Sequence, residues 1–376
     1  MSTIARNHLW KIFFISIAVK LVYYVFVYFL PYPQHNRLDI EYFGQYFLQT
    51  YSNNDSGWYE KIADRGYADM KTATDQDDIN SFAFFPLYPK SAALLMQVFG
   101  IGVRASFFIV TFIYSISAFL FFYIFVYQYI RREKIAFYST LILILFPHHY
   151  YFSMFYTESL FLLLSVLSFY FIQSQKWIPF AISSSLLVLT RINGLLLFLP
   201  LLLFYFSREE KILSKPVFIS KKIFFFLPML FTFLIYCIYL KVITGDFLVF
   251  KTCSESGWGG GPTFPLKSLY QTLTDDTAYV FKYDAVYSIF FLMLSFIFLI
   301  RKEYYFFAFA ILIILLPLYE GGTISQPRFI SVIFPFSLLI GILISKMRVP
   351  VLFIFLLFAL QLYSYSFWAI TDPLSY

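Results

Sequence analysis

The chain has 376 residues, of which 60% are hydrophobic and only 13% are charged. A soluble globular domain usually carries about 25% charged residues, so this composition excludes an ordinary soluble protein and predicts a polytopic membrane protein. The net charge of +7 is explained by basic connectors between spans, and we expect no nucleic acid partner.

Apolar runs along the chain predict about eleven transmembrane helices. In order they cover residues 9–30, 102–130, 135–147, 151–173, 177–189, 194–206, 223–243, 285–300, 304–318, 329–345 and 349–368. The first run is too long for the apolar core of a signal peptide and has no small-residue cleavage site, so we expect a retained span. The sequence therefore predicts an all-α integral membrane protein with one domain over residues 1–376.

Basic residues in alternate connectors predict the orientation. They are Arg6 and Lys11 at the start, then Arg131, Arg132, Lys134, Arg208, Lys211, Lys215, Lys221, Lys222, Arg301, Lys302, Lys346 and Arg348. Because positive charge collects on the cytoplasmic side, the N-terminus is expected in the cytoplasm and, after an odd number of spans, the C-terminus outside. The loops 31–101, 147–150, 190–193, 244–284 and 319–328 then share the non-cytoplasmic face, which suggests that their polar residues form one site.

The first outer loop, residues 31–101, contains nine of the chain's 21 carboxylates. Asp55 stands at the start of a predicted helix, where free N–H groups and the helix dipole keep a carboxylate ionised. An ionised carboxylate at the bilayer surface can act as general base toward a sugar hydroxyl. The competing interpretation is a plain N-cap in an exposed loop.

The same loop ends in the aromatic segment FFPLYP, residues 84–89. Two prolines argue against a regular helix here, because each removes a backbone donor and restricts the residue before it. The pattern predicts a re-entrant or interfacial segment whose backbone is satisfied by contacts with protein. It serves either to anchor the loop in the membrane or to contact a lipid substrate.

Two arginines in later outer loops are candidate phosphate ligands. Arg191 is the only charge for many residues on either side, and Asn193 and the glycine after it interrupt the helix. An arginine beside apolar spans is costly and indicates function, and its planar fork fits two phosphate oxygens. The alternatives are a structural pair with Glu158 or snorkelling to the interface. Arg328, which follows Gln326, is either a second phosphate or sugar contact or an interface anchor.

Two histidines and an acid complete the candidates. His148 and His149 can hydrogen-bond a phosphate, although a histidine pair at a helix junction is often structural. Glu158 is expected about two turns inside its span, unpaired unless Arg191, Arg328 or a histidine reaches it. We expect Glu158 to organise the site rather than to transfer a proton.

Metal and cofactor patterns are weak. Cys237 and Cys253 form no disulfide framework, and the histidines at 8, 35, 148 and 149 have no ligand spacing, so no cofactor or metal is expected, although the carboxylates of the first loop leave a divalent ion open. The glycine-rich segment 257–262 lacks the Lys-Ser/Thr and the preceding strand of a phosphate loop. We interpret it as a lid, in which Trp258 can stack on a sugar.

Taken together, these segments resemble the PIG-V-type mannosyltransferases (GPI mannosyltransferase II-like), which add the second mannose in GPI-anchor assembly, and their bacterial relatives. The matching segments, in order, are Asp55, IADRGY at 62–67, AFFPLYP at 83–89, FSMFYTESL at 152–160, TRING at 190–194 and QPRF at 326–329. The resemblance implies a GT-C glycosyltransferase with many spans, an essential acid in the first outer loop and a polyprenyl-phosphate sugar as donor. Trp58 and Tyr67 become further candidate substrate contacts.

One departure from the family pattern bears on the sugar. The tryptophan expected before the acid is Asn54, so the wall facing the sugar differs and the sugar need not be mannose. Asn54, Asp55 and Ser56 also form a glycosylation sequon that would place a glycan on the proposed base. This and the short chain favour a bacterial protein of the inner membrane.

The hypothesis from the sequence is inverting sugar transfer on the outer face to a glycan, glycolipid or protein acceptor. Asp55 takes the proton of the acceptor hydroxyl, and Arg191, Arg328 and His148 meet the charge of the leaving polyprenyl phosphate. A transporter or flippase of lipid-linked sugars is the main rival, but such proteins usually show paired half-repeats, which this sequence lacks. The second rival is a non-catalytic subunit that binds a partner through residues 31–101.

Overall fold

The computed structural model describes residues 3–29, 44, 47–67, 79–208, 221–259, 261–275 and 279–370. Among these residues it contains helices and no strand. Their bounds are α1 Thr3–Phe29, α3 Ser56–Arg65, η1 Ser81–Ala83, α5 Leu87–Phe99, α6 Val103–Ile130, α7 Glu133–Leu145, η2 His149–Ser153, α8 Glu158–Gln173, α9 Trp177–Val188, α10 Asn193–Leu196, α11 Phe198–Arg208, η4 Lys221–Phe226, α12 Leu227–Thr244, α13 Val249–Trp258, α14 Pro265–Thr274, α15 Tyr279–Ile300, α16 Tyr304–Tyr319, α17 Gln326–Ser331, α18 Phe334–Ile344 and α19 Pro350–Ala369.

Every predicted apolar run overlaps at least one of these helices. Five helical stretches in the described chain are long and apolar enough to cross a membrane, namely Ile4–Phe29, Val103–Ile130, Lys221–Thr244, Phe281–Ile300 and Pro350–Ala369. Five shorter apolar helices lie among them. The protein is therefore a multi-pass helical membrane protein, whereas the count of eleven spans and its orientation stay predictions.

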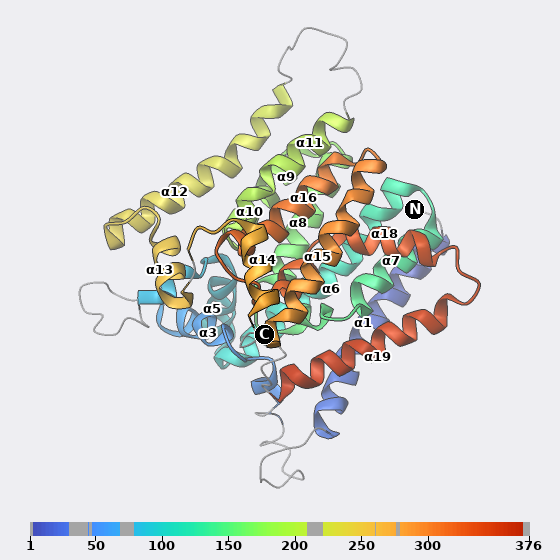
Figure 1. Cartoon of the computed structure of the whole chain (residues 1–376), viewed down its shortest axis with the longest axis horizontal. Helices are drawn as coiled ribbons and strands as arrows, with labels where there is room; N and C mark the ends of the chain where they lie inside the picture. The colour runs from blue at the N-terminus through green and yellow to red at the C-terminus, as the bar shows by residue number, and fades with distance from the viewer. Residues whose placement is uncertain are drawn as a thin grey trace.

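The bundle is organised around α6. This helix packs against α7 and α8, α7 packs against α18, and α8 packs against α9. Figure 1 shows α12 at one edge of the molecule and α1 and α19 at the other. The contact between α7 and α18 is unusually close, because a Cβ added to Gly341 would lie 2.5 Å from Cα of Ser139. Only a residue without a side chain fits there.

The basic connectors meet at one end of the bundle. Arg208, at the end of α11, lies over the ring of Tyr129 with 4.9 Å to its centroid. The Tyr129 hydroxyl donates to Glu303 at 3.0 Å, and Arg301 pairs with Glu303 at 2.8 Å. Figure 1 shows these ends at the top of the molecule, whereas α3, α5 and α13 lie toward the lower left. Arg208 and Arg301, from two of the predicted cytoplasmic connectors, thus lie near each other, whereas the orientation itself stays a prediction.

The start of α8 differs from the prediction. The apolar run 151–173 was expected to be one helix with Glu158 two turns inside it, but α8 begins at Glu158. The residues before it form η2 and a bent, non-helical segment that is bound to the first loop, where the Phe155 N–H donates to the Tyr51 carbonyl at 2.9 Å. Apolar composition alone does not distinguish a buried irregular segment from a helix.

The segment 84–89 also differs, since its second half is helical. Pro86 is the N-cap of α5 and Pro89 lies in the first turn of that helix. The N–H groups of a first turn have no partner within the helix, so proline removes nothing there. The expectation that two prolines exclude a regular helix was wrong for residues 87–89.

Two further apolar runs are each divided between two helices. The run 194–206 forms α10 and α11, and the run 329–345 lies in α17 and α18, with the break at residues 332–333. Pro335 stands in the first turn of α18, where its fixed φ suits the start of a helix. At these breaks, polar residues of the short helices α10 and α17 face the interior of the bundle.

Candidate active site

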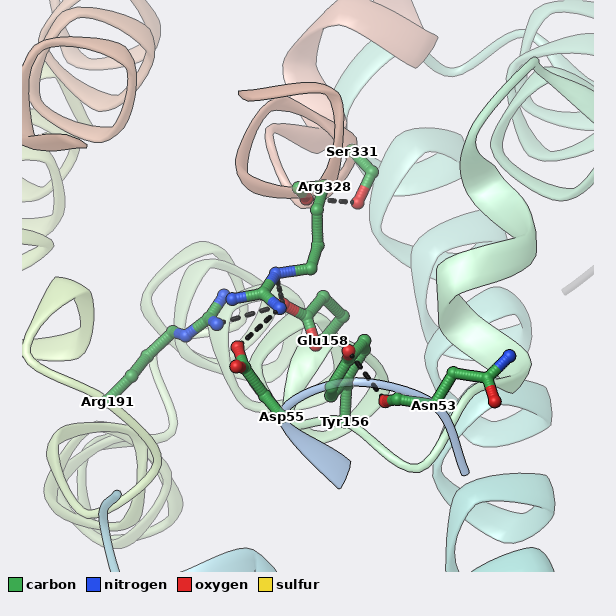
Figure 2. A network of polar contacts seen from close by, with 7 residues as sticks. All are labelled: Asn53, Asp55, Tyr156, Glu158, Arg191, Arg328 and Ser331. Carbon is green, nitrogen blue, oxygen red and sulfur yellow. Dashed lines mark hydrogen bonds and ion pairs between the residues drawn. The ribbon is translucent and has the colours of Figure 1, made fainter. Parts of the chain in front are cut away.

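Four charged side chains from distant parts of the chain meet in one cluster (Figure 2). Asp55 precedes α3, Glu158 begins α8, Arg191 lies between α9 and α10, and Arg328 lies in α17. Arg328 Nη1 donates to Asp55 Oδ2 at 2.9 Å, and its Nε lies 3.3 Å from Glu158 Oε1. Arg191 Nη2 lies 2.9 Å from the same Glu158 oxygen. The structure thus brings these four predicted residues together.

The cluster is balanced in charge and graded in exposure. Two carboxylates face two guanidinium groups, which is the pairing that buried charges require. The Glu158 side chain is 0% exposed and Arg328 is 12% exposed, whereas Asp55 is 23% exposed. Burial opposes the charge of Arg328, but Asp55 and Glu158 outweigh burial and raise the pKa of this guanidinium well above its usual value. Glu158 is therefore the inner acid and Asp55 the accessible one.

Asp55 occupies the N-cap position of α3, but its side chain makes no capping hydrogen bond. The expected stabilisation by helix N–H groups is replaced by the ion pair with Arg328. The residue before it, Asn54, has φ of +53°, in the left-handed region that asparagine tolerates and bulky residues avoid. This conformation gives a physical reason for asparagine at this position.

Aromatic side chains enclose the guanidinium groups. The Arg328 guanidinium lies 4.7 Å from the ring centroid of Tyr156, and Arg191 lies 5.2 Å from that of Phe329. The Tyr156 hydroxyl in turn donates to the Asn53 carbonyl at 3.0 Å, two residues before Asp55 (Figure 2). A delocalised guanidinium is well suited to stacking on rings while its edge pairs with carboxylates.

The turn that carries Arg191 depends on a glycine. A Cβ added to Gly194 would lie 2.2 Å from the Leu187 carbonyl oxygen, so α10 approaches the end of α9 as closely as backbones allow. Arg191 Nη1 and Asn193 Nδ2 are buried and have no hydrogen-bond partner among the described residues. Unpaired buried donors are costly, and two of them on one turn can receive an anion.

The turn that carries Arg328 is held by residues on α15 and α16. Gln326 is fully buried, and its Nε2 donates to the Ile314 carbonyl at 3.2 Å, so it joins α17 to α16. The carboxylate of Asp284, buried at the start of α15, lies near the backbone of Ser325 and Gln326. No motif in the sequence singles out Asp284.

The two histidines stand apart from the cluster among the described contacts. His148 Nε2 pairs with the Tyr283 hydroxyl at 2.7 Å, and His149 Nδ1 donates to the Leu143 carbonyl at 2.9 Å. Burial lowers the pKa of His148 to about 3 and that of His149 to about 4. Both rings are neutral near pH 7, and the hydrogen bond from His148 to the donor phosphate stays a prediction.

Trp58 and Tyr67 pack the first loop together. Trp58 stacks on Phe84 with 5.8 Å between ring centroids, and Tyr67 stacks on Phe82 at 5.1 Å. The Tyr67 hydroxyl donates to the Phe84 carbonyl at 2.6 Å. Tyr67 therefore joins the end of α3 to η1, while Trp58 lies one helical turn after Asp55.

The glycine-rich segment is joined to the end of α16. The Gly261 N–H donates to the Glu320 carbonyl at 2.9 Å, and the Thr263 N–H donates to the Tyr319 carbonyl at 2.7 Å. Gly260 and the Trp258 side chain lie outside the described residues, so the predicted sugar contact of Trp258 stays a prediction. Within the described residues, no three His, Cys, Asp or Glu side chains gather in a way that suits a metal ion.

Comparison with known proteins finds no matching family model and no matching curated protein. Two solved structures are similar in fold. ArnT from Cupriavidus metallidurans, bound to undecaprenyl phosphate, superposes with a TM-score of 0.50 and 11% identity, covering 82% of this chain and 61% of ArnT. The apo oligosaccharyltransferase of Archaeoglobus fulgidus gives a TM-score of 0.50 and 13% identity over 96% of this chain and 56% of its own.

The chain thus spans about three fifths of ArnT and just over half of the oligosaccharyltransferase. Both neighbours are GT-C membrane glycosyltransferases. At these identities the likeness shows the fold alone, and it confirms the GT-C-like helical fold that the sequence predicts.

Proposed function

We propose that the protein is a membrane glycosyltransferase that moves a sugar, mannose by the family resemblance, from a polyprenyl-phosphate donor to a hydroxyl group. The acceptor is a glycan, glycolipid or protein on the non-cytoplasmic face. Two facts support this proposal. The fold is shared with ArnT, whose structure holds undecaprenyl phosphate, and the charged cluster contains the groups that such a transfer needs.

The single observation that carries the proposal is the arrangement of Asp55 beside Arg328. A partly exposed carboxylate stands 2.9 Å from a guanidinium, and a buried acid, Glu158, joins that guanidinium to Arg191. A base for a hydroxyl group and cations for a phosphate therefore lie within one small volume. A structural ion-pair network alone would not require the outer acid to remain accessible.

The proposed reaction is a single displacement. The acceptor oxygen forms a bond to the anomeric carbon while the bond from that carbon to the donor phosphate oxygen breaks. The hydroxyl proton passes to Asp55, and the phosphate leaves with one more negative charge, which Arg328 and Arg191 balance. Preorganised cations in a water-poor site contribute roughly 10²–10³ in rate for each good contact.

Donor binding and base activation are coupled in this scheme. Without donor, Arg328 pairs with the Asp55 carboxylate. A donor phosphate competes for the same guanidinium edge, because phosphate and carboxylate oxygens match the same fork. The unpartnered buried donors of Arg191 and Asn193 are the further groups that we assign to the phosphate. Glu158 keeps both arginines in place during this exchange.

The test is sugar transfer from radiolabelled polyprenyl-phosphate mannose in membranes that contain wild type or Asp55→Asn, with extracts of the native host as acceptor. General-base removal typically lowers the rate by about 10²–10⁴. The matched control is Asp64→Asn, because Asp64 lies on the same helix but is 54% exposed and, within the described part of the chain, forms its ion pair with the neighbouring Arg65. Wild-type transfer that is lost in Asp55→Asn and kept in Asp64→Asn is the expected result.

Two outcomes contradict the proposal. Transfer that survives Asp55→Asn at equal protein level removes Asp55 as the base. If the wild type transfers no sugar from polyprenyl-phosphate mannose or from a panel of other polyprenyl-linked sugars, the glycosyltransferase proposal fails. A carrier of lipid-linked sugars is then favoured.

A further inference from the structure

We propose that Trp368, in the last turn of α19, is a positioning residue that fixes Asp55 through the segment before it, residues 50–53. The kinetic part of this inference rests on the proposed role of Asp55 as base. The contacts themselves do not depend on that role. No motif in the sequence links α19 to the first loop.

Two hydrogen bonds join Trp368 to this segment, beside a longer one of 3.4 Å between the hydroxyls of Thr50 and Tyr365, one turn earlier on α19. Trp368 Nε1 donates to the Thr50 carbonyl at 2.7 Å, and Asn53 Nδ2 donates to the Trp368 carbonyl at 2.9 Å. The residues are 318 and 315 positions apart, so both bonds are set by the tertiary fold. Figure 1 shows the end of the red helix α19 reaching the blue segment ahead of α3.

The joint is buried and closely packed. Trp368 is 1% exposed, and Asn53 is 7% exposed. The Trp368 ring packs edge-on against Tyr156 with 5.5 Å between centroids. Since the Tyr156 hydroxyl also donates to the Asn53 carbonyl, the tryptophan packs against a second residue that holds the same segment.

Residues 50–53 are also restrained by contacts with elements other than α19. The Tyr51 carbonyl accepts the Phe155 N–H at 2.9 Å, and the Ser52 hydroxyl donates to Glu60 on α3. The two hydrogen bonds of Trp368, to Thr50 and from Asn53, form a clasp that restrains the segment from the side of α19. Asn54 then turns through its left-handed conformation, which aims the Asp55 carboxylate at Arg328.

Such support has a kinetic consequence. A misplacement of about 1 Å caused by a change far from the chemistry can reduce the rate by about 100-fold. A residue that acts only by placing the base lowers kcat and leaves the affinity for the donor unchanged, because the phosphate contacts come from other elements.

The experiment compares Trp368→Phe, which deletes only the N–H donor and part of the ring, with Asn53→Ala, which deletes the other half of the clasp. The matched control is Trp10→Phe, because Trp10 is 59% exposed on α1. For each full-length protein, kcat and the KM for polyprenyl-phosphate mannose are measured. Amide hydrogen exchange is measured over residues 47–60, with α8 as internal reference.

We expect both variants to lower kcat by about 10- to 100-fold with the donor KM within twofold, and to speed exchange in residues 47–60 but not in α8. Trp10→Phe should match the wild type in every measurement. If Trp368→Phe does not fold, Asn53→Ala decides the question, since it leaves the ring in place. Unchanged exchange over residues 47–60, unchanged kcat, or a rise in KM equal to the fall in kcat overturns the inference.

Hydrogen exchange separates this inference from the proposed function. If the wild type transfers no sugar but Trp368→Phe loosens residues 47–60, the clasp exists and the proposed reaction fails. If the wild type is active and the variants leave both the segment and kcat unchanged, the reaction stands and the positioning role fails.

Discussion

Asp55 stands at the start of α3, yet its carboxylate meets the guanidinium of Arg328 rather than the free N–H groups of the helix. The two residues are 273 positions apart. The proposed base and the proposed phosphate ligand therefore fix each other's position through this ion pair. The geometry of the pair depends on α8, α17 and α19.

Arg328→Lys tests the bidentate role of this guanidinium. Lysine keeps the charge but cannot contact Asp55 and Glu158 at once from a planar fork. We expect kcat for sugar transfer to fall by about 10²–10³, the effect of losing one oriented donor, with a normal amount of folded protein. Arg348→Lys, at an exposed connector, is the control. Transfer within twofold of wild type in Arg328→Lys would show that a point charge is sufficient.

Glu158→Gln tests the inner acid. Glu158 is fully buried and pairs with both Arg191 and Arg328, so its neutralisation leaves two buried cations with one carboxylate. Removing one member of a buried network typically costs about 3–5 kcal/mol. We therefore expect a clear fall in the thermal unfolding temperature in detergent, together with loss of transfer.

The control for Glu158 is Glu255→Gln, because Glu255 is 42% exposed and its ion pair among the described residues is with Lys251 on the same helix. A Glu158→Gln protein as stable as this control would mean that the arginines find other partners, and Glu158 would not be the organiser of the cluster.

The four charged residues of the cluster could be found from the sequence because charge is rare in this chain. Burying Arg191 or Glu158 is costly unless a partner is present, so each isolated charge in an apolar region indicates a partner elsewhere. The predicted topology places the outer loops, and with them these residues, on one face of the membrane. Which arginine meets which acid depended on the tertiary fold.

Other features carried no signal in the sequence. Aromatic residues make up 24% of the chain, so Trp368 does not stand out, and its partner is a backbone carbonyl that any residue supplies. Asp284 is an acid near the predicted start of a span, a place where interfacial acids are ordinary. The start of α8 was misplaced because Tyr150 to Tyr156 are apolar without being α-helical.

The lowered pKa values of His148 and His149 predict a loss of stability in mild acid. In the unfolded chain these rings take up protons near pH 6.5, whereas in the folded protein burial delays this to about pH 3 and about pH 4. The contribution of the two histidines to the free energy of unfolding is therefore fully present above pH 6.5 and falls as the pH drops toward 4. The loss at pH 5 is roughly 2 kcal/mol for each histidine.

This prediction is checked by thermal unfolding in detergent at pH 7.5 and pH 5. His148→Gln keeps a partner for the Tyr283 hydroxyl and should reduce the difference between the two unfolding temperatures. If the unfolding temperatures at pH 7.5 and pH 5 differ by the same amount in wild type and variant, His148 does not contribute to the pH dependence of stability. Since both rings are neutral near pH 7, neither should add a step to the pH dependence of kcat between pH 6 and 8.

Gly194→Ala tests whether the close approach of α10 and α9 places Arg191. The added methyl group would lie 2.2 Å from the Leu187 carbonyl oxygen and 2.7 Å from its carbon. Backbone atoms of a packed helix cannot move aside easily, so α10 must shift. Overpacking of this kind costs about 1–3 kcal/mol, and the shift carries Arg191, three residues earlier, away from Glu158.

We expect Gly194→Ala to lower both the unfolding temperature and the rate of sugar transfer. Gly102→Ala is the control, because Gly102 has negative φ and open space where a Cβ would stand. If Gly194→Ala loses stability but keeps the wild-type rate, the glycine serves packing alone and Arg191 is placed by its ion pair. If it keeps stability and loses transfer, the position of Arg191 limits the reaction, because the phosphate then meets only one arginine.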